Sequence, residues 1–193
     1  MALEDKDLIE VESDFNPNPA DFGNERKVLK VALENELKGR RLYLMYSKKL
    51  TSELARKVFV HLANEEMDHI KDIEEFIKSF SLGPGVDVDG MIKPHSLDNT
   101  KEFFGRLVKD LKEEVRPSDD DNRSREVAMK IEKAGYEYYK KGAEMTKDKE
   151  LQRFFRWLME QERSHYMLIR NTFEYMDNPD SFFSGEEHWI LEG

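Results

Sequence analysis

Two sets of three residues in this sequence have the side chains and the spacing to bind metal ions. Each set has a glutamate, a second glutamate 30 positions later, and a histidine three positions after that. Residues three apart on a helix point to the same side, so each Glu-x-x-His pair can offer an oxygen and a nitrogen to one site. The two sets together supply ligands for two metal ions. The residues are Glu36, Glu66 and His69 in the first half and Glu132, Glu162 and His165 in the second.

The two sets belong to an internal repeat with a constant offset of 96 residues. Residues 31–73 align with 127–169 without a gap and share ten identities, where composition alone supplies roughly two or three. Most identities are three or four residues apart, which places them on one face of a helix. The repeated face therefore combines the candidate ligands with apolar residues of a buried seam. The identities are Val31/Val127, Ala32/Ala128, Glu36/Glu132, Gly39/Gly135, Tyr43/Tyr139, Phe59/Phe155, Leu62/Leu158, Glu66/Glu162, His69/His165 and Ile73/Ile169.

Each half of the repeat predicts a helical hairpin. A hairpin cannot bury its own apolar face, so we expect the two to pack together as an all-α four-helix bundle. The connection between the hairpins is long and contains an amphipathic segment at 97–115, so it can return along the bundle and make the second and third helices parallel. All six candidate ligands then meet at one level in the core. The predicted helices cover about residues 23–49, 52–80, 122–145 and 148–176.

The length of the chain is typical of one domain with a substantial core. We therefore predict a single domain over residues 1–193. Its predicted segments are an N-terminal arm at 1–22, a first hairpin at 23–80, a crossover with a short helix at 81–121, a second hairpin at 122–178 and a C-terminal tail at 179–193.

The ligand types restrict the metal. Four carboxylates balance the charge of two divalent ions, so the loaded site would be close to neutral. Mixed oxygen and nitrogen donors favour iron or manganese over calcium or magnesium, and affinity alone does not exclude zinc. Two ions bridged by carboxylates lie about 3.5–4 Å apart and can hold dioxygen or peroxide between them. A pair of Fe(II) ions can deliver the two electrons that reduce H₂O₂ to water.

Two tyrosines and two glycines recur beside the candidate ligands. Tyr43 and Tyr139 each lie seven residues after a first-helix glutamate, where a phenol can donate to a ligand carboxylate. The alternative is a buried ring with its hydroxyl at the edge of the core. Gly39 and Gly135 break helix propensity at matching positions, which suggests that space is needed beside the site.

Other residues near the ligands have simpler interpretations. A single Glu-x-x-His in a Glu-rich helix is usually a solvated charged face, but two in register beside Leu62 and Leu158 are not. Glu65 lies off the repeated face and is predicted to be surface charge. His61 aligns with Trp157 and is predicted to be a packing position.

Composition excludes several classes of function. The net charge of −10 argues against nucleic acid or an anionic membrane as a partner. The chain has no cysteine, so it has neither disulfides nor thiolate metal sites. It lacks the features of a secretory signal and any run of roughly 18 apolar residues. These features predict a soluble cytoplasmic protein.

The sequence resembles the ferritin-like superfamily, and most closely the rubrerythrin-type diiron proteins. The resemblance covers about residues 24–176 and rests on ALENELKGRRLY, MKIEKAGYEYY, NEEMDHI and EQERSHY. It implies a left-handed crossover bundle with two irons, terminal ligands Glu36 and Glu132, and bridging ligands Glu66 and Glu162. His69 and His165 complete the two iron sites.

The resemblance also implies a choice of activities, which in this family include peroxide reduction, ferroxidase chemistry and iron storage. We expect an oxidoreductase that reduces hydrogen peroxide or dioxygen with electrons from an external donor protein. The alternatives are a ferritin-type iron store and a structural dimetal bundle without turnover. Two departures separate this chain from typical rubrerythrins: it lacks the cysteines of a rubredoxin domain, and it has Gly135 where many carry a further glutamate.

We also expect a homo-oligomer, with a dimer as the favoured state. The tail from Asp180 to Gly193 replaces the short fifth helix of ferritins. It is acidic and carries Phe182, Phe183 and Trp189. We expect an irregular arm whose aromatic residues cover a bundle, either that of this chain or that of a second copy.

Overall fold

The computed structural model describes residues 24–81, 88–90, 92, 97–111 and 116–182. These residues form helices joined by short connections, and none of them lies in a β-strand. The all-α prediction is therefore confirmed. The helices are α2 (Glu25–Ser47), α3 (Glu53–Ser81), α4 (Leu97–Leu111), α5 (Asp119–Met145), α6 (Lys149–Asp177) and α7 (Pro179–Phe182).

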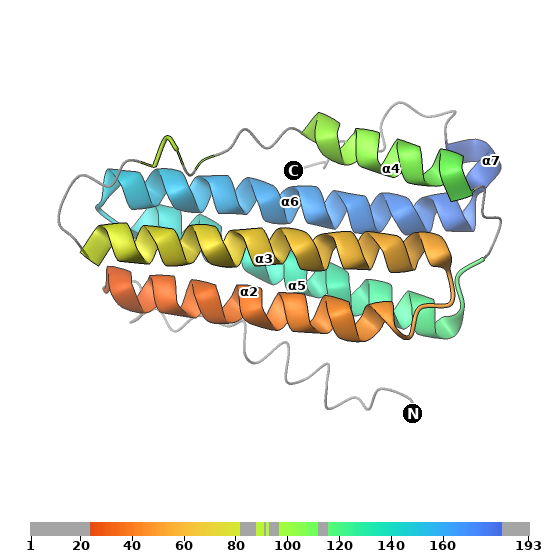
Figure 1. The fold of residues 1–193 in the computed structure, drawn as a ribbon, viewed down its shortest axis with the longest axis horizontal. Coiled ribbons are helices and arrows are strands. Elements are labelled where there is room, and N and C mark those ends of the chain that lie inside the picture. The colour runs from red at the N-terminus through yellow and green to blue at the C-terminus, as the bar shows by residue number, and fades with distance from the viewer. Residues whose placement is uncertain (1–23, 82–87, 91, 93–96, 112–115, 183–193) are drawn as a thin grey trace.

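The four long helices form two antiparallel hairpins, α2 with α3 and α5 with α6 (Figure 1). The hairpins pack through contacts of α3 with α6 and of α2 with α5. Helices α3 and α5 lie on a diagonal of the bundle and run in the same direction (Figure 1). This is the arrangement expected from a long crossover between the second and third helices. Helix α4 of that crossover lies along the bundle against α3 and α6.

Helix α5 begins at Asp119, three residues before the predicted start at residue 122. The prediction was late because the chain carries a capping box here: Ser118 Oγ accepts from the N–H of Asp121, and the Asp121 carboxylate accepts from the N–H of Ser118. The same carboxylate accepts the N–H of Thr51 at 2.8 Å. Burial would raise the pKa of Asp121, but these hydrogen bonds lower it overall. One buried carboxylate thus connects the α2–α3 turn to the start of α5.

The apolar core is divided by a polar centre. Along α2, Val28, Leu29 and Ala32 belong to one cluster, and Tyr43 and Tyr46 belong to another. Glu36 lies between these two groups and is itself buried. Apolar packing on both sides therefore encloses the buried polar centre of the bundle.

The crossover helix and the start of the tail pack on the same end of α6. Phe104 of α4 lies 6.1 Å from Tyr175 and 5.5 Å from Phe182, measured between ring centroids. Phe182 ends the short helix α7 and is buried, so the expectation of an irregular tail is wrong for residues 179–182. These residues are ordered because Phe182 packs on α4 and α6 of its own chain. Phe183, Trp189 and the predicted arm at 1–22 lie outside the described residues.

None of the described helices has an apolar stretch of the length needed to cross a membrane.

Candidate metal centre

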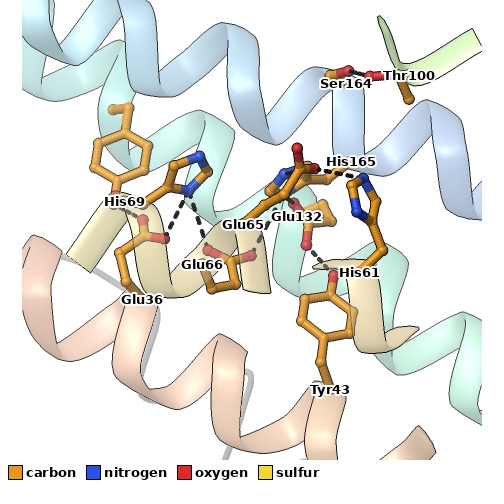
Figure 2. A network of polar contacts seen from close by, with 11 residues as sticks. Glu36, Tyr43, His61, Glu65, Glu66, His69, Thr100, Glu132, Ser164 and His165 are labelled. Atoms are coloured by element: carbon orange, nitrogen blue, oxygen red, sulfur yellow. Dashed lines mark hydrogen bonds and ion pairs between the residues drawn. The ribbon is translucent and has the colours of Figure 1, made fainter. Parts of the chain in front are cut away.

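The bundle brings all six candidate ligands to one level in its interior. One comes from α2, two from α3, one from α5 and two from α6. Each is at most 4% exposed, although carboxylates are almost never buried without a compensating partner. Figure 2 shows several of them converging between the helices. The buried residues are Glu36, Glu66, His69, Glu132, Glu162 and His165.

Glu66 lies between the two histidines. Its Oε2 is 3.3 Å from Nδ1 of His69, and its Oε1 is 3.4 Å from Nδ1 of His165 (Figure 2). Each histidine also contacts a glutamate of the neighbouring helix: His69 Nδ1 is 3.2 Å from Glu36 Oε2, and His165 Nδ1 is 3.4 Å from Glu132 Oε2. Both imidazoles therefore direct Nδ1 into the centre, and one carboxylate joins the two halves.

The ligand atoms form two overlapping groups, each of a size that a metal ion could occupy. Within each group, one atom from every residue lies within 4.8 Å of the others, and Glu66 belongs to both groups. The first group is Glu36, Glu66, His69 and Glu162, and the second is Glu66, Glu132 and His165.

Buried polar atoms without hydrogen bonds are a second observation that supports a dimetal centre. Three buried atoms that face the centre make no hydrogen bond to any of the described residues, although Glu132 Oε2 and His165 Nδ1 lie within ion-pair distance of each other: Glu132 Oε2, Glu162 Oε1 and His165 Nδ1. A buried polar atom without a partner costs about 1–3 kcal/mol, so native proteins rarely retain several in one place without a ligand. Coordination to a cation would satisfy all three.

The pKa values of the buried ligands also indicate that this centre needs positive charge. Burial, and then the charge of Glu66, raises the pKa of Glu36 to about 8. Burial and the neighbouring carboxylates raise the pKa of Glu162 well above its usual value. Burial would lower the pKa of His69, but hydrogen bonds to Glu36 and Glu66 raise it to about 10. Protons thus reduce the repulsion between carboxylates, which is the role that divalent cations would take over.

The two tyrosines donate across the repeat. The Tyr43 hydroxyl on α2 donates to Glu132 on α5, and the Tyr139 hydroxyl on α5 donates to Glu36 on α2. Burial and nearby carboxylates raise the pKa of both phenols well above the usual value, so both stay protonated as donors. The predicted contact with a carboxylate is present, but each tyrosine serves the glutamate of the opposite half.

Glu65 is a functional candidate that the sequence interpretation missed. Its carboxylate lies 3.1 Å from Nε2 of His165, on the side of the ring away from Glu66 (Figure 2). Burial would raise the pKa of Glu65, but contact with His165 and His61 lowers it to about 2. The prediction of a surface charge is wrong because a residue one step off the seam still faces the adjacent helix, α6. A signal was present in the repeat: the aligned residue, Gln161, is also polar.

His61 packs as predicted and also makes a polar contact. Its ring stacks on Phe103 of α4 with 3.8 Å between centroids. Its Nε2 lies 3.3 Å from Glu65 Oε2. A polar row therefore extends from His165 through Glu65 to the edge of α4.

Gly135 leaves space that Glu162 occupies, whereas Gly39 does not have this role. A Cβ added at Gly135 would lie 2.5 Å from Glu162 Oε2 and 2.9 Å from Glu162 Cδ. A Cβ added at Gly39 would make only ordinary contacts, the nearest at 3.8 Å to Glu66. The expectation that space is needed beside the site holds for Gly135 alone.

Because Gly135 and Gly39 differ in the space beside them, their alanine variants form a matched pair. Gly135→Ala is expected to displace the Glu162 carboxylate and to weaken binding of Co(II) on the order of 10-fold. Gly39→Ala should leave Co(II) binding unchanged and, through helix propensity, stabilise the fold by up to about 1 kcal/mol. Chelator competition and urea unfolding measure the two effects. Equal Co(II) affinities in both variants would contradict the prediction.

The class of protein is thus defined as a four-helix bundle with a buried carboxylate and histidine site suited to two metal ions. The Rubrerythrin family model matches residues 27–173, which is most of the chain. This chain belongs to the rubrerythrin family, as the resemblance predicts. A comparison with curated proteins gave no match, and a comparison with solved structures also gave none. The family implies a dimetal carboxylate site, which the buried Glu and His residues fit.

Proposed function

We propose that this protein is a diiron carboxylate oxidoreductase that reduces hydrogen peroxide or dioxygen. The observation that carries the proposal is Glu66, whose two oxygens each face a different histidine. A carboxylate in that place can be shared by two ions, and adjacent ions suit two-electron chemistry. Two bound Fe(II) ions would supply the two electrons that, with two protons, convert one H₂O₂ into two molecules of water.

The residues of the chain would hold and orient this centre. His69 and Glu36 would bind one ion, and His165 and Glu132 would bind the other, with Glu66 shared between them. Glu162, which the resemblance implies as a second shared ligand, lies in the first of the two groups. Tyr43 and Tyr139 restrict the rotation of Glu132 and Glu36 through their hydrogen bonds. The apolar clusters on both sides exclude water from the buried carboxylates. We propose that the electrons come from an external donor protein.

The test is stoichiometric oxidation of bound Fe(II). The protein is loaded anaerobically with two Fe(II) per chain and mixed with H₂O₂ in a stopped-flow instrument. Rapid oxidation that consumes one H₂O₂ for every two Fe(II) is expected, because both ions would lie in one site. Slow oxidation without a fixed ratio would contradict the proposal. Zn(II)-loaded protein is the control, since it fills the site without electrons to give.

A second candidate function is ferritin-type iron oxidation and storage. Gly135 favours it, because the family resemblance associates a further glutamate at this position with the redox cycle of rubrerythrins. Light scattering separates the two candidates. We propose a dimer, which cannot enclose a mineral core, whereas storage requires a large closed shell.

A further inference from the structure

The two histidines of the proposed centre have different surroundings on their outer sides. His165 Nε2 lies 3.1 Å from the carboxylate of Glu65, which in turn lies 3.3 Å from His61. The side chains of Glu65 and His61 are 27% and 28% exposed. The outer side of His165 therefore faces a polar, anionic group (Figure 2), and this group is itself partly exposed beside Phe103 of α4.

The residues that align with Glu65 and His61 in the second half of the repeat are neutral. The 96-residue offset of the repeat replaces His61 with Trp157 and Glu65 with Gln161. The structure confirms the first correspondence, since the Trp157 ring lies 5.8 Å from the His69 ring in an edge contact. Gln161 is 3% exposed, and its Nε2 makes no hydrogen bond within the part of the chain that the structure describes. At the aligned positions, a buried amide and an indole thus replace the carboxylate and the imidazole of the other half.

This difference changes the strength of the two histidines as ligands. A carboxylate beside the outer nitrogen of a histidine orients the ring and makes the inner nitrogen a stronger donor. The carboxylate also adds one negative charge near one metal position only, where partial burial limits screening by water. A neutral amide supplies neither the added charge nor the same increase in basicity.

We infer that the two metal positions are unequal, that the position at Glu132 and His165 binds a divalent cation first, and that Glu65 is the positioning residue responsible. The inference rests on the proposed dimetal site. The inferred order of binding depends on Glu65 and Gln161, which differ between the two halves of the repeat. The proposed dimetal site depends on the six ligands, which are the same in both halves.

The experiment titrates the full-length apoprotein with Co(II) alone, followed by its visible absorption in competition with a chelator. The wild type is expected to bind two Co(II) in separate steps. Glu65→Gln should weaken the tighter Co(II) binding step by about 10- to 100-fold and leave the weaker step unchanged. The two dissociation constants should therefore become more similar. The absorption spectrum of the first Co(II) should change as well, which a general loss of stability would not produce.

Two further variants complete the test. Glu160→Gln removes the same charge from an exposed side chain on α6 and should change neither step. Gln161→Glu places a carboxylate at the position that aligns with Glu65 and should tighten the weaker step. Two equal steps in the wild type, or a Glu65→Gln effect no larger than that of Glu160→Gln, would overturn the inference while leaving the dimetal site intact. Fewer than two Co(II) per chain would instead overturn the proposed site, and the inference with it.

Discussion

Replacing Glu66 with alanine is expected to weaken metal binding at both positions by on the order of 100-fold or more, and to abolish oxidation of Fe(II) by peroxide. The reason is geometric, because Glu66 belongs to both groups of ligand atoms. The variant also leaves Nδ1 of His69 and of His165 without a shared partner. Equilibrium dialysis with Co(II), followed by stopped-flow oxidation of Fe(II), measures the two losses.

The matched control is Asp68→Ala, two residues further along α3. Asp68 is exposed and pairs with Lys71, so its loss should change neither the metal content nor the rate. Glu66→Ala also removes a buried negative charge that repels the other carboxylates, so the metal-free variant should still fold. A variant that retains two Co(II) per chain with wild-type affinity would contradict the assignment of Glu66.

The sequence predicted the bundle because two periodicities agreed. The three- and four-residue steps marked the helices, and the 96-residue offset related the hairpins, so Glu36 and Glu132 had to occupy equivalent levels. The end of the first hairpin was also close, since α3 reaches Ser81 and the prediction was residue 80. The start of α5 was missed because a capping box between Ser118 and Asp121 depends on side-chain hydrogen bonds, not on apolar spacing.

What the sequence did not predict lies between helices. Glu65 and Gln161 occupy aligned positions, but only the packing of α3 against α6 reveals that Glu65 contacts His165. The partners of Tyr43 and Tyr139 were likewise undetermined. Spacing along one helix placed each phenol near a glutamate of its own half, whereas the contact of α2 with α5 pairs it with the other half. Contacts within a helix follow from periodicity, but contacts between helices require the rotation of each helix about its axis.

Removing bound metal is expected to lower the melting temperature by about 10 to 20 °C. Each of two ions at 100 times its Kd stabilises the native state by about 2.7 kcal/mol, so both together contribute about 5.4 kcal/mol. Each kcal/mol corresponds to about 2–4 °C for a chain of this size. The difference should grow as pH rises. Glu36 has a pKa of about 8 in the folded metal-free protein against 4.5 as its ordinary value, so the stability of that form falls as pH rises through this interval.

Titration of His69 also makes the metal-free protein less stable as pH rises. Its pKa of about 10 lies above the ordinary 6.5, so the stability contributed by its protonated form is complete below about 6.5 and is lost as pH rises through about 10. Bound metal replaces these protons and therefore gains affinity over the same range. Differential scanning calorimetry of apoprotein and Co(II)-loaded protein at about pH 6 and pH 8 should show the larger difference at pH 8. In Glu66→Ala, Co(II) should change the melting temperature very little at either pH, because the variant lacks the carboxylate shared by the two metal positions. A change in melting temperature that survives this substitution would show that the ions bind elsewhere on the acidic surface.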